Sequence, residues 1–471
     1  MDGLECSEIN RSKLERTLRI DSEFYSKSAI KVSDMLQSRS HDLLTTFVNV
    51  SDGNHMGISD CFIDEGVPYY RGQDAGAFFI ENSNPICINE KTFELPVMKR
   101  SHLKKGDVIL SIVGTIGSLS LVYSDKNATC SCKLAILRPK EGKSAELLAT
   151  FLRGKYGQAQ ITRFTRGAVQ KGLILEDMDQ LVVPTFGDGI VEAIKNAVQS
   201  AYQIQEKANI HYREAQRTLM NSVGSILAPA ESVSVRNIST SFYTTGRLDA
   251  EYYQPKYDIL FDELKKFSCK RLGGPNGIVN IKKSIEPGSE AYTEDGIPFV
   301  RVSDISKFGI SEPDIKLRSD IIPNPEVLFP PKDTILLSKD GSVGIAYKVE
   351  ATMPIITSGA LLHLKVRDKT EVLPDYLTLV LNSPVVQLQA ERDSNGAIIQ
   401  HWKPSEIENV IIPILDMDTQ KEIAAKVQEA FTLRKQSKQL LEYAKQTVEM
   451  AIEQGEDVAL AWLKDKIPVE V

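Results

Sequence analysis

Two polar loops carry the side chains best suited to holding an anionic or hydrogen-bonding ligand. They span Arg163–Lys171 and Arg392–Lys403, at corresponding places in the two halves of the chain. Arg, Lys, Asn, Gln and His hold phosphates or read base edges, and the Gly-Ala pair within each loop lets a backbone approach a ligand closely. One such loop is more typical of a solvated surface, but recurrence with different side chains favours two related targets. The candidate residues are Arg163, Arg166, Gln170, Lys171, Asn395, Gln400, His401 and Lys403.

A third basic segment, Lys99–Lys105, contains four cations and no acid. Its candidates for DNA contact are Lys99, Arg100, Lys104 and Lys105. Arg71 and Arg301 each follow a Gly-x-Pro-aromatic strand and precede an aspartate by three residues. For these two arginines, an ion pair that fixes the strand end and a DNA contact are both open interpretations.

The sequence templates of common enzymes do not occur in this chain. It contains no P-loop, no Gly-x-Ser-x-Gly elbow, no His-Glu-x-x-His and no methyltransferase-type Asn-Pro-Pro or Pro-Cys loop. Pro313-Asp314 and Pro374-Asp375 lack the downstream partners of a nuclease site and are typical of turns or helix starts. Cys130-Ser-Cys132 has no second pair to complete a metal site, so buried thiols on a strand are favoured. The chain is therefore expected to be non-catalytic, with no cofactor and no metal of its own.

The chain is an internal duplication with an offset of 226 to 230 residues. Arg19–Tyr25 matches Arg247–Tyr253, and Gly66–Arg71 matches Gly296–Arg301. Two further blocks keep the same order: the strand-turn Asp107–Gly117 against Asp333–Gly344, and the ungapped stretch Arg163–Ser222 against Arg392–Ala451. Because chance similarity does not keep one offset through four blocks, we interpret the chain as a tandem repeat.

Each repeat is predicted to have the same elements. A helix carrying the Arg-x-Asp-x-Glu-aromatic-Tyr motif opens it, short strands follow, and then come a further helix, a loop and a last strand. The short Gly-x-x-Gly segments are expected to be turns between strands and not phosphate cradles. The predicted strands are 107–113, 118–123, 134–138, 334–338, 344–349 and 360–366, and the predicted middle helices are 145–160 and 375–391.

A long helix closes each repeat. Val191–Ser222 has a heptad stripe that is poor in large apolar residues, so it should need a partner, and the second repeat supplies one at the same stripe. Gln205 and Arg434 occupy equivalent polar seam positions that would set the register of the pair. The seam candidates, which also form the predicted partner-docking helices, are Val191, Ile194, Val198, Gln205, Tyr212, Leu219, Ile423, Val427, Arg434, Leu441 and Val448.

Composition limits the class of protein. The 471 residues have a net charge of −7, which argues against a generally basic nucleic-acid coat but not against local DNA binding. The six cysteines are scattered, unlike a disulfide framework. With no apolar run long enough to span a bilayer and no apolar signal core, we expect a cytoplasmic protein.

Taken together, these motifs resemble the specificity (S) subunit of type I restriction-modification systems. The resemblance rests on Arg247–Pro255, Gly296–Asp304, Asp333–Gly344, the Gly-Ala loops and the long helix after each globule, and it covers nearly the whole chain. It implies an α+β fold in which two similar mixed α/β target recognition globules are separated by a pair of long antiparallel coiled-coil-like helices with pseudo-twofold symmetry.

The resemblance also implies partners. Each globule would read one half of a bipartite, asymmetric site in double-stranded DNA, and the helices would bind two methyltransferase (M) subunits. S-adenosylmethionine would belong to those subunits, and ATP and Mg to the restriction (R) subunits that can join. A helix of 32 residues spans about 48 Å, roughly 14 base pairs of duplex. The alternative is a duplicated scaffold that binds protein partners without DNA; an enzyme with an unrecognised site is a third hypothesis.

The expected domain boundaries follow the repeat. They are an N-terminal helical segment 1–37, target recognition domain 38–188, spacer helix 189–227, linker 228–246, target recognition domain 247–417 with its opening helix 247–266, spacer helix 418–455 and a C-terminal tail 456–471.

Overall fold

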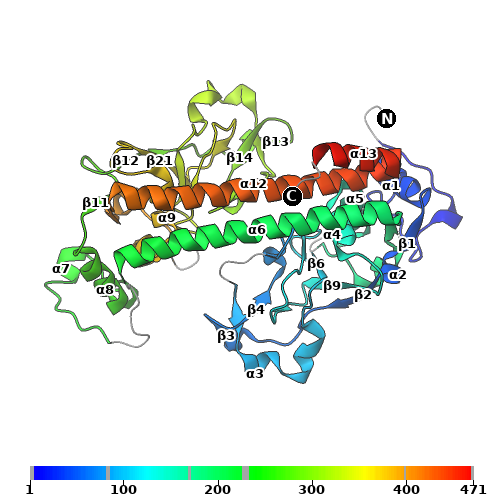
Figure 1. The fold of residues 1–471 in the computed structure, drawn as a ribbon, viewed down its shortest axis with the longest axis horizontal. Helices are drawn as coiled ribbons and strands as arrows, with labels where there is room; N and C mark the ends of the chain where they lie inside the picture. The colour runs from blue at the N-terminus through cyan, green and yellow to red at the C-terminus, as the bar shows by residue number, and fades with distance from the viewer. Residues whose placement is uncertain (1–4, 81–84, 168–170, 225–232, 397–398, 468–471) are drawn as a thin grey trace. The chain divides into compact units, whose positions relative to one another are not determined.

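A computed structural model describes residues 5–80, 85–167, 171–224, 233–396 and 399–467. The chain divides into two compact units, Met1–Gln205 with Lys435–Val471, and Glu206–Arg434. Each unit therefore holds one globule together with one half of each long helix. Figure 1 shows both long helices as continuous ribbons.

The first globule is built on a four-stranded antiparallel sheet in the order β2-β9-β6-β7. A smaller sheet, β3-β5-β4-β8, lies beside it and has β4 parallel to β8. β1 pairs separately with β10, which closes the globule before the long helix. The strands are β1 His41–Leu43, β2 Val48–Asp52, β3 Phe62–Ile63, β4 Val67–Tyr70, β5 Cys87–Ile88, β6 Val108–Ser111, β7 Leu119–Leu121, β8 Thr129–Cys130, β9 Leu134–Pro139 and β10 Val182–Pro184.

The second globule repeats this topology. Its main sheet runs β12-β21-β18-β19, its small sheet β13-β17-β14-β20 has β14 parallel to β20, and β11 pairs with β22 as β1 does with β10. A hairpin, β15 with β16, is added after β14. The strands are β11 Cys269–Arg271, β12 Val279–Lys283, β13 Tyr292–Thr293, β14 Ile297–Val300, β15 Ile305–Ser306, β16 Gly309–Ile310, β17 Lys316–Leu317, β18 Ile335–Ser338, β19 Ala346–Lys348, β20 Ile356–Thr357, β21 Leu361–Val366 and β22 Ile411–Pro413.

The central strands are apolar up to a final serine because both of their faces are covered. All four residues of β6 and of β18 are buried. In β6, Val108 and Leu110 pack into the cluster that contains the helices, whereas Ile109 packs into a second cluster with residues of the small sheet. Such continuous apolar runs are expected for strands that lie between two layers.

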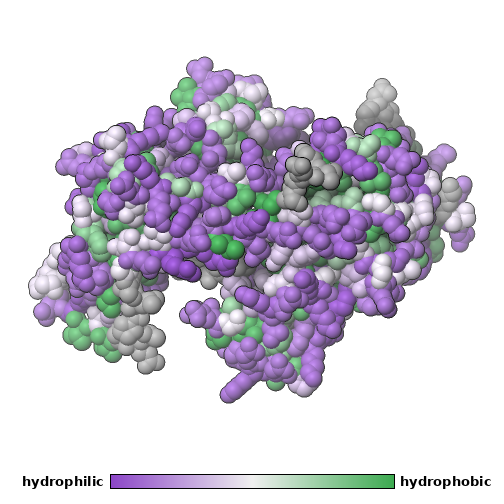
Figure 2. All heavy atoms as spheres, viewed as in Figure 1, coloured by the Kyte–Doolittle hydropathy of each residue, from purple (hydrophilic) through white to green (hydrophobic). Residues whose placement is uncertain are grey.

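The shorter helices surround these sheets. They are α1 Lys27–Gln37, α2 Leu44–Phe47, α3 Glu90–Phe93, α4 Ala145–Arg153 and α5 Lys155–Phe164 in the first unit, and α7 Phe242–Thr245, α8 Pro255–Leu264, α9 Pro374–Leu381, α10 Pro384–Asp393 and α11 Pro404–Glu408 in the second. Hydrophilic residues predominate on the face seen in Figure 2. None of the helices that the structure describes is both long and apolar enough to cross a membrane.

The long helices are α6, Asp188–Val223, and α12, Met417–Gln454. In the first unit Ile194, Val198 and Ala201 share a core with Ala444 and Val448.

In the second unit Tyr212, Ala215 and Leu219 share a core with Ile423 and Val427. Within each unit the start of one helix meets the end of the other, so the two run antiparallel, as predicted. The expected seam is displaced by one residue at its ends, where Ile190 and Val223 are buried and Val191 and Ser222 are only half-buried.

Three predicted elements differ from the structure. The predicted helices 145–160 and 375–391 are each two helices, because Gly154 caps α4 and the Ser383-Pro384 step separates α9 from α10. The Arg-x-Asp-x-Glu motif does not lie on the opening helix, since α1 and α8 begin only after it. Its arginine and aspartate instead bond each other, Arg19 Nε to Asp21 at 2.8 Å and Arg247 Nε to Asp249 at 2.9 Å.

The C-terminal segment is also more ordered than a tail. Residues Glu456–Lys466 form helix α13 after a break at Gly455, whose φ of +101° ends α12. Ala459 and Leu463 of α13 are buried, and Ala459 belongs to the core of the first unit. This helix therefore completes the first unit.

Candidate nucleic-acid interface

Three loops meet at one end of the main sheet in the first globule. They are the 3₁₀ turn Gly72–Asp74 after β4, the turn 112–118 between β6 and β7, and the Gly-Ala loop after α5. Thr115 Oγ1 donates a 3.0 Å hydrogen bond to the Gly72 carbonyl, which joins the first two loops. The backbone N–H of Leu173 donates to the Ile112 carbonyl at 2.9 Å, which joins the third.

In the second globule, hydrogen bonds join the turn between β18 and β19 to the Gly-Ala loop. The N–H of Trp402 donates to the Lys339 carbonyl at 2.7 Å, the counterpart of the Leu173–Ile112 bond. The N–H of Gly341 donates to the Gln400 carbonyl at 2.9 Å, so the Gly-x-x-Gly turn is tied directly to the Gly-Ala loop. Both Gly-x-x-Gly segments are turns between antiparallel strands, as predicted, and neither precedes a helix.

Arg71 and Arg301 sit at identical turns beside these loops. The backbone N–H of each arginine donates to the aspartate three residues on, Asp74 or Asp304, at 2.8 Å. Their Nε atoms lie 3.3 and 3.6 Å from the same carboxylates. The ion-pair interpretation therefore describes the isolated chain. Each arginine side chain stays more than a third exposed, so an anion can still reach it.

The structure divides the basic segment Lys99–Lys105 between two ends of the sheet. Arg100 pairs with Asp52, the last residue of β2, at the same end as the three loops. Lys104 and Lys105 precede β6 at the opposite end, where the Lys104 N–H bonds Asp107 at 2.7 Å and Lys105 lies 3.5 Å from Asp125. Lys99 is exposed on the 3₁₀ helix Pro96–Ser101. Arg100 of this segment thus joins the loop end of the sheet, whereas Lys104 and Lys105 lie at the opposite end.

The two arginines of the first Gly-Ala loop are used inside the globule. Arg166 bonds the buried Asp177 at 2.7 Å and lies 3.8 Å from Glu15. Burial raises the pKa of Asp177, and the Arg166 guanidinium opposes that rise. Arg163 donates from Nε to the Phe24 carbonyl at 3.0 Å. Lys171 is exposed and lies 3.6 Å from Glu23, while Gln170 lies outside the described residues.

The second Gly-Ala loop presents more of its predicted residues to solvent. Asn395, Gln400 and His401 are exposed. Asp340 accepts from Lys339 and lies 2.8 Å from Nδ1 of His401. Burial opposes the ionisation of Asp340, but the hydrogen bonds from Lys339 and His401 lower its pKa, so the carboxylate stays charged. Lys403 is exposed, and its backbone N–H donates a 3.0 Å hydrogen bond to the Glu406 carboxylate at the start of α11.

The structure adds interface residues that the sequence pattern did not single out. Lys133 is exposed, and its carbonyl accepts from the Ile112 N–H at 3.0 Å, which places it beside the turn between β6 and β7. Lys339 and Asp340 hold the equivalent turn in the second globule. The internal repeat could have indicated Lys339. It lies two residues before Gly341, as Ile112 lies two residues before Gly114.

No metal site is found among the described residues, in which no group of three His, Cys, Asp or Glu side chains converges. All six cysteines are free thiols. Cys130 is fully buried on β8, and this burial raises the pKa of its thiol. The prediction of buried thiols on a strand therefore holds for Cys130 alone, because β8 ends there and Cys132 is half-buried in the turn that follows.

Comparisons with known proteins give one family match and several similar solved structures. No curated protein matches the sequence. Among solved structures, the type I restriction-modification S subunit from M. genitalium is 14% identical over 92% of this chain and 96% of its own, with a TM-score of 0.35. The HsdS subunit from Thermoanaerobacter tengcongensis is 16% identical over 88% and 96%, with a TM-score of 0.29. The model of the type I restriction modification DNA specificity domain matches residues 275–443. This stretch, which holds β12 through β22 and the first two-thirds of α12, is similar to the type I restriction modification DNA specificity domain.

Proposed function

We propose that the chain is the DNA specificity subunit of a type I restriction-modification complex, in which each globule reads one half of a bipartite site. The observation that carries this proposal is the specificity-domain match of the second globule combined with the repetition of its topology in the first. The strand orders β2-β9-β6-β7 and β12-β21-β18-β19 are equivalent, and the Leu173–Ile112 hydrogen bond matches the Trp402–Lys339 bond.

The loop residues support two different half-sites. At the loop end, the first globule presents Thr115 and Lys133, whereas the second presents the Lys339–Asp340–His401 cluster. Donor and acceptor groups in different arrangements select different base edges in the major groove. The two halves of the recognised sequence should therefore not be related by a palindrome.

The charges of the chain fit a surface that binds DNA tightly only when partner subunits are present. The net charge is −7, and the arginines at the loop end already have carboxylate neighbours in Asp52, Asp74 and Asp304. Phosphates must compete with these carboxylates, so the isolated chain should bind DNA weakly. Methyltransferase subunits docked on α6 and α12 would supply further phosphate contacts, S-adenosylmethionine and the methylation chemistry.

The test is DNA binding by this chain assembled with its methyltransferase subunits. Methylome sequencing of cells with and without the gene first identifies the bipartite site. The complex should then bind that duplex at least about tenfold more tightly than a duplex with either half scrambled, and binding should weaken steeply with salt. Binding that ignores both halves would overturn the proposal and leave the protein-scaffold hypothesis.

A further inference from the structure

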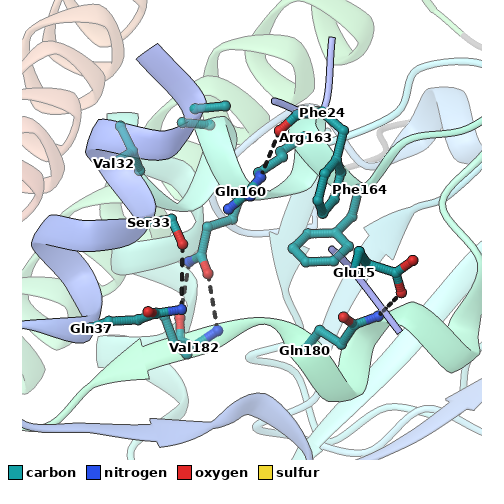
Figure 3. Close-up of a pocket in the computed structure, with 12 residues that line it drawn as sticks. Glu15, Phe24, Val32, Ser33, Gln37, Gln160, Arg163, Phe164, Gln180 and Val182 are labelled. Atoms are coloured by element: carbon teal, nitrogen blue, oxygen red, sulfur yellow. Dashed lines mark hydrogen bonds between the residues drawn. The ribbon is translucent and has the colours of Figure 1, made fainter. Parts of the chain in front are cut away.

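The first unit contains a pocket whose counterpart in the second unit is occupied by a side chain. The pocket has a volume of about 170 Å³ and lies between α1, α5 and the N-terminal segment that carries Glu15. Figure 3 shows Val32, Ser33 and Gln37 of α1 on one side and Phe24, Phe164 and Glu15 on the other.

The framework around the pocket is the same in both units. Gln160 bonds the backbone N–H and C=O of Val182, both at 3.0 Å, and Gln389 bonds those of Ile411 at 2.8 and 2.9 Å.

The cation–aromatic contacts below it also match. The Arg19 guanidinium lies 4.5 Å from the centre of the Phe24 ring, and that of Arg247 lies 4.4 Å from the Tyr252 ring. At offsets of 228 and 229, Ser33 corresponds to Phe261 and Arg163 to Arg392. The difference between the units is therefore local to the pocket.

One part of that difference is an aromatic ring. In the second unit the Arg392 guanidinium lies 4.4 Å from the Phe261 ring centre and 5.0 Å from that of Tyr252, so it contacts two rings. In the first unit the Arg163 guanidinium lies 4.2 Å from Phe24, and Ser33 stands where Phe261 would be. The pocket is thus the space that a second ring would take.

The two arginines also differ in their carboxylate neighbours. Arg392 pairs with Asp393 at 2.8 Å, whereas the residue after Arg163 is Phe164, which packs edge-on against Phe24 at 5.2 Å. In the part of the chain that the structure describes, Arg163 forms no ion pair with a carboxylate. Its cation is available to the face of a ring, an interaction that strengthens when both groups are desolvated.

We propose that this pocket binds one aromatic ring, stacked on the Arg163 guanidinium as Phe261 stacks on Arg392. For scale, a benzene ring fits a cavity of about 150 Å³, whereas sites for drug-sized ligands begin near about 300 Å³; the polar side chains Glu15, Gln37 and Gln160 also line this pocket. The volume of about 170 Å³ therefore suits one six-membered ring. The ring comes either from a Phe or Tyr side chain of a partner polypeptide or from a free small aromatic molecule.

The first experiment measures binding of p-cresol, the side-chain analogue of tyrosine, to the full chain by ligand-observed NMR and calorimetry. The wild-type chain should bind p-cresol saturably at one site, with a dissociation constant in the millimolar range. Ser33→Phe, which supplies the missing ring, should weaken this binding about tenfold or more. Ser28→Phe, at an exposed position on the same helix, is the matched control and should bind like the wild type.

The reciprocal variant tests the repeat argument. Phe261→Ser opens the equivalent space in the second unit and should add a second p-cresol site. The proposal is overturned if the wild type shows no saturable binding, or if Ser33→Phe folds with an unchanged melting profile and binds p-cresol as the wild type does. If Phe261→Ser fails to fold, Ser33→Phe still tests the proposal. This variant fills a space and deletes few atoms, so we expect it to fold.

A second arm, which rests on the proposed function, identifies the source of the ring. If a methyltransferase subunit supplies it, assembly should block the p-cresol site and Ser33→Phe should weaken assembly about tenfold or more. If the ring belongs to a free molecule, the site stays open in the complex and Ser33→Phe assembles normally. Failure of both the wild type and Ser33→Phe to assemble would contradict the proposed function, while the p-cresol result would stand.

Discussion

At the residue scale, neighbouring side chains determine whether a predicted ligand-binding residue is held inside the globule or remains exposed to solvent. Arg166 and His401 were both predicted as ligand-binding side chains. Arg166 is tied to Asp177 inside the globule, whereas the side chain of His401 is 60% exposed although it contacts Asp340. His401 is therefore the better candidate for reading a base edge. DNA contact by either residue stays a prediction.

Replacing His401 should change the specificity of one half-site. We expect His401→Ala to reduce discrimination between bases at one or two positions of a single half-site by roughly 10- to 100-fold, since one good base contact contributes about 1–3 kcal/mol. The measurement is competition binding of the assembled complex with singly substituted duplexes. His41→Ala changes an exposed histidine on β1, far from the loops in sequence, and should leave both half-sites unchanged. Equal losses at both half-sites would contradict this role.

His363 on β21 should make the second unit sensitive to acid. Burial lowers the pKa of His363 from 6.5 to about 4, and its Nε2 lies 2.8 Å from Thr357 Oγ1. Because the folded pKa lies below the unfolded one, protonation favours unfolding. The stability that depends on neutral His363 is complete above pH 6.5 and declines as the pH falls toward 4, by about 2–3 kcal/mol in total.

The neutral variant His363→Gln tests this linkage. Its melting temperature should vary less between pH 6.5 and 4 than that of the wild type, in the transition assigned to the second unit. His41→Gln should retain the full pH dependence. A wild-type slope that persists in His363→Gln would show that other groups cause it.

At the element scale, the Gly-x-x-Gly turns are structural supports of the loop end. Gly117 and Gly344 have φ values of +87° and +86°, a region that favours glycine. The carbonyl of each accepts a hydrogen bond from a helical glutamine, Gln158 at 3.0 Å and Gln387 at 2.8 Å. The turns are thereby anchored to α5 and α10, which also precede the Gly-Ala loops. Close backbone approach and not phosphate binding explains these glycines.

We therefore expect Gly117→Ala to destabilise the first unit. A Cβ would stand in an unfavourable φ region and 2.7 Å from Gln158 Oε1, so the free energy of unfolding should fall by about 1–2 kcal/mol. Thermal melting and hydrogen exchange of the turn measure this loss. Gly57→Ala, where nothing lies within 4 Å of the added methyl, is the control and should change little. Equal stability of both variants would contradict the argument.

At the scale of the whole molecule, the long helices are the segments that both units share. The seam keeps its polar positions: Ser437 donates to the Ala201 carbonyl at 2.7 Å in the first unit, and Arg434 donates to Asn209 in the second. Ser437 is buried, whereas Arg434 and Asn209 are half-buried. Polar groups at a helix seam restrict the register of the pair. With α6 at 36 residues, its length corresponds to about 54 Å.

Shortening both helices equally should change the spacing of the two half-sites. Removing residues 203–209 from α6 and 432–438 from α12 takes one heptad from each and keeps Tyr202, which packs on Phe79 and Tyr123, and Phe431, which packs near Phe308. The preferred gap should shorten by about 3 base pairs, because seven helical residues span roughly 10.5 Å. Binding to duplexes with graded gaps measures this, and a changed half-site sequence would contradict the spacer role.

The sequence by itself determined the duplication, the antiparallel helix pair and the main strands, because these depend on periodicity and on residues close together in the chain. It misplaced the Arg-x-Asp-x-Glu motif on a helix, because a motif does not reveal which of its side chains bond each other.

Only the tertiary structure decided which cations remain available at the loop end. Arg166 is held by Asp177, Arg100 joins the loop end through Asp52, and Lys104 lies at the other end of the sheet. The ring-sized pocket beside Arg163 likewise arises from residues of α1 and α5 more than a hundred positions apart in the chain. Such arrangements depend on side chains that meet only after folding, so neither spacing nor composition could have placed them.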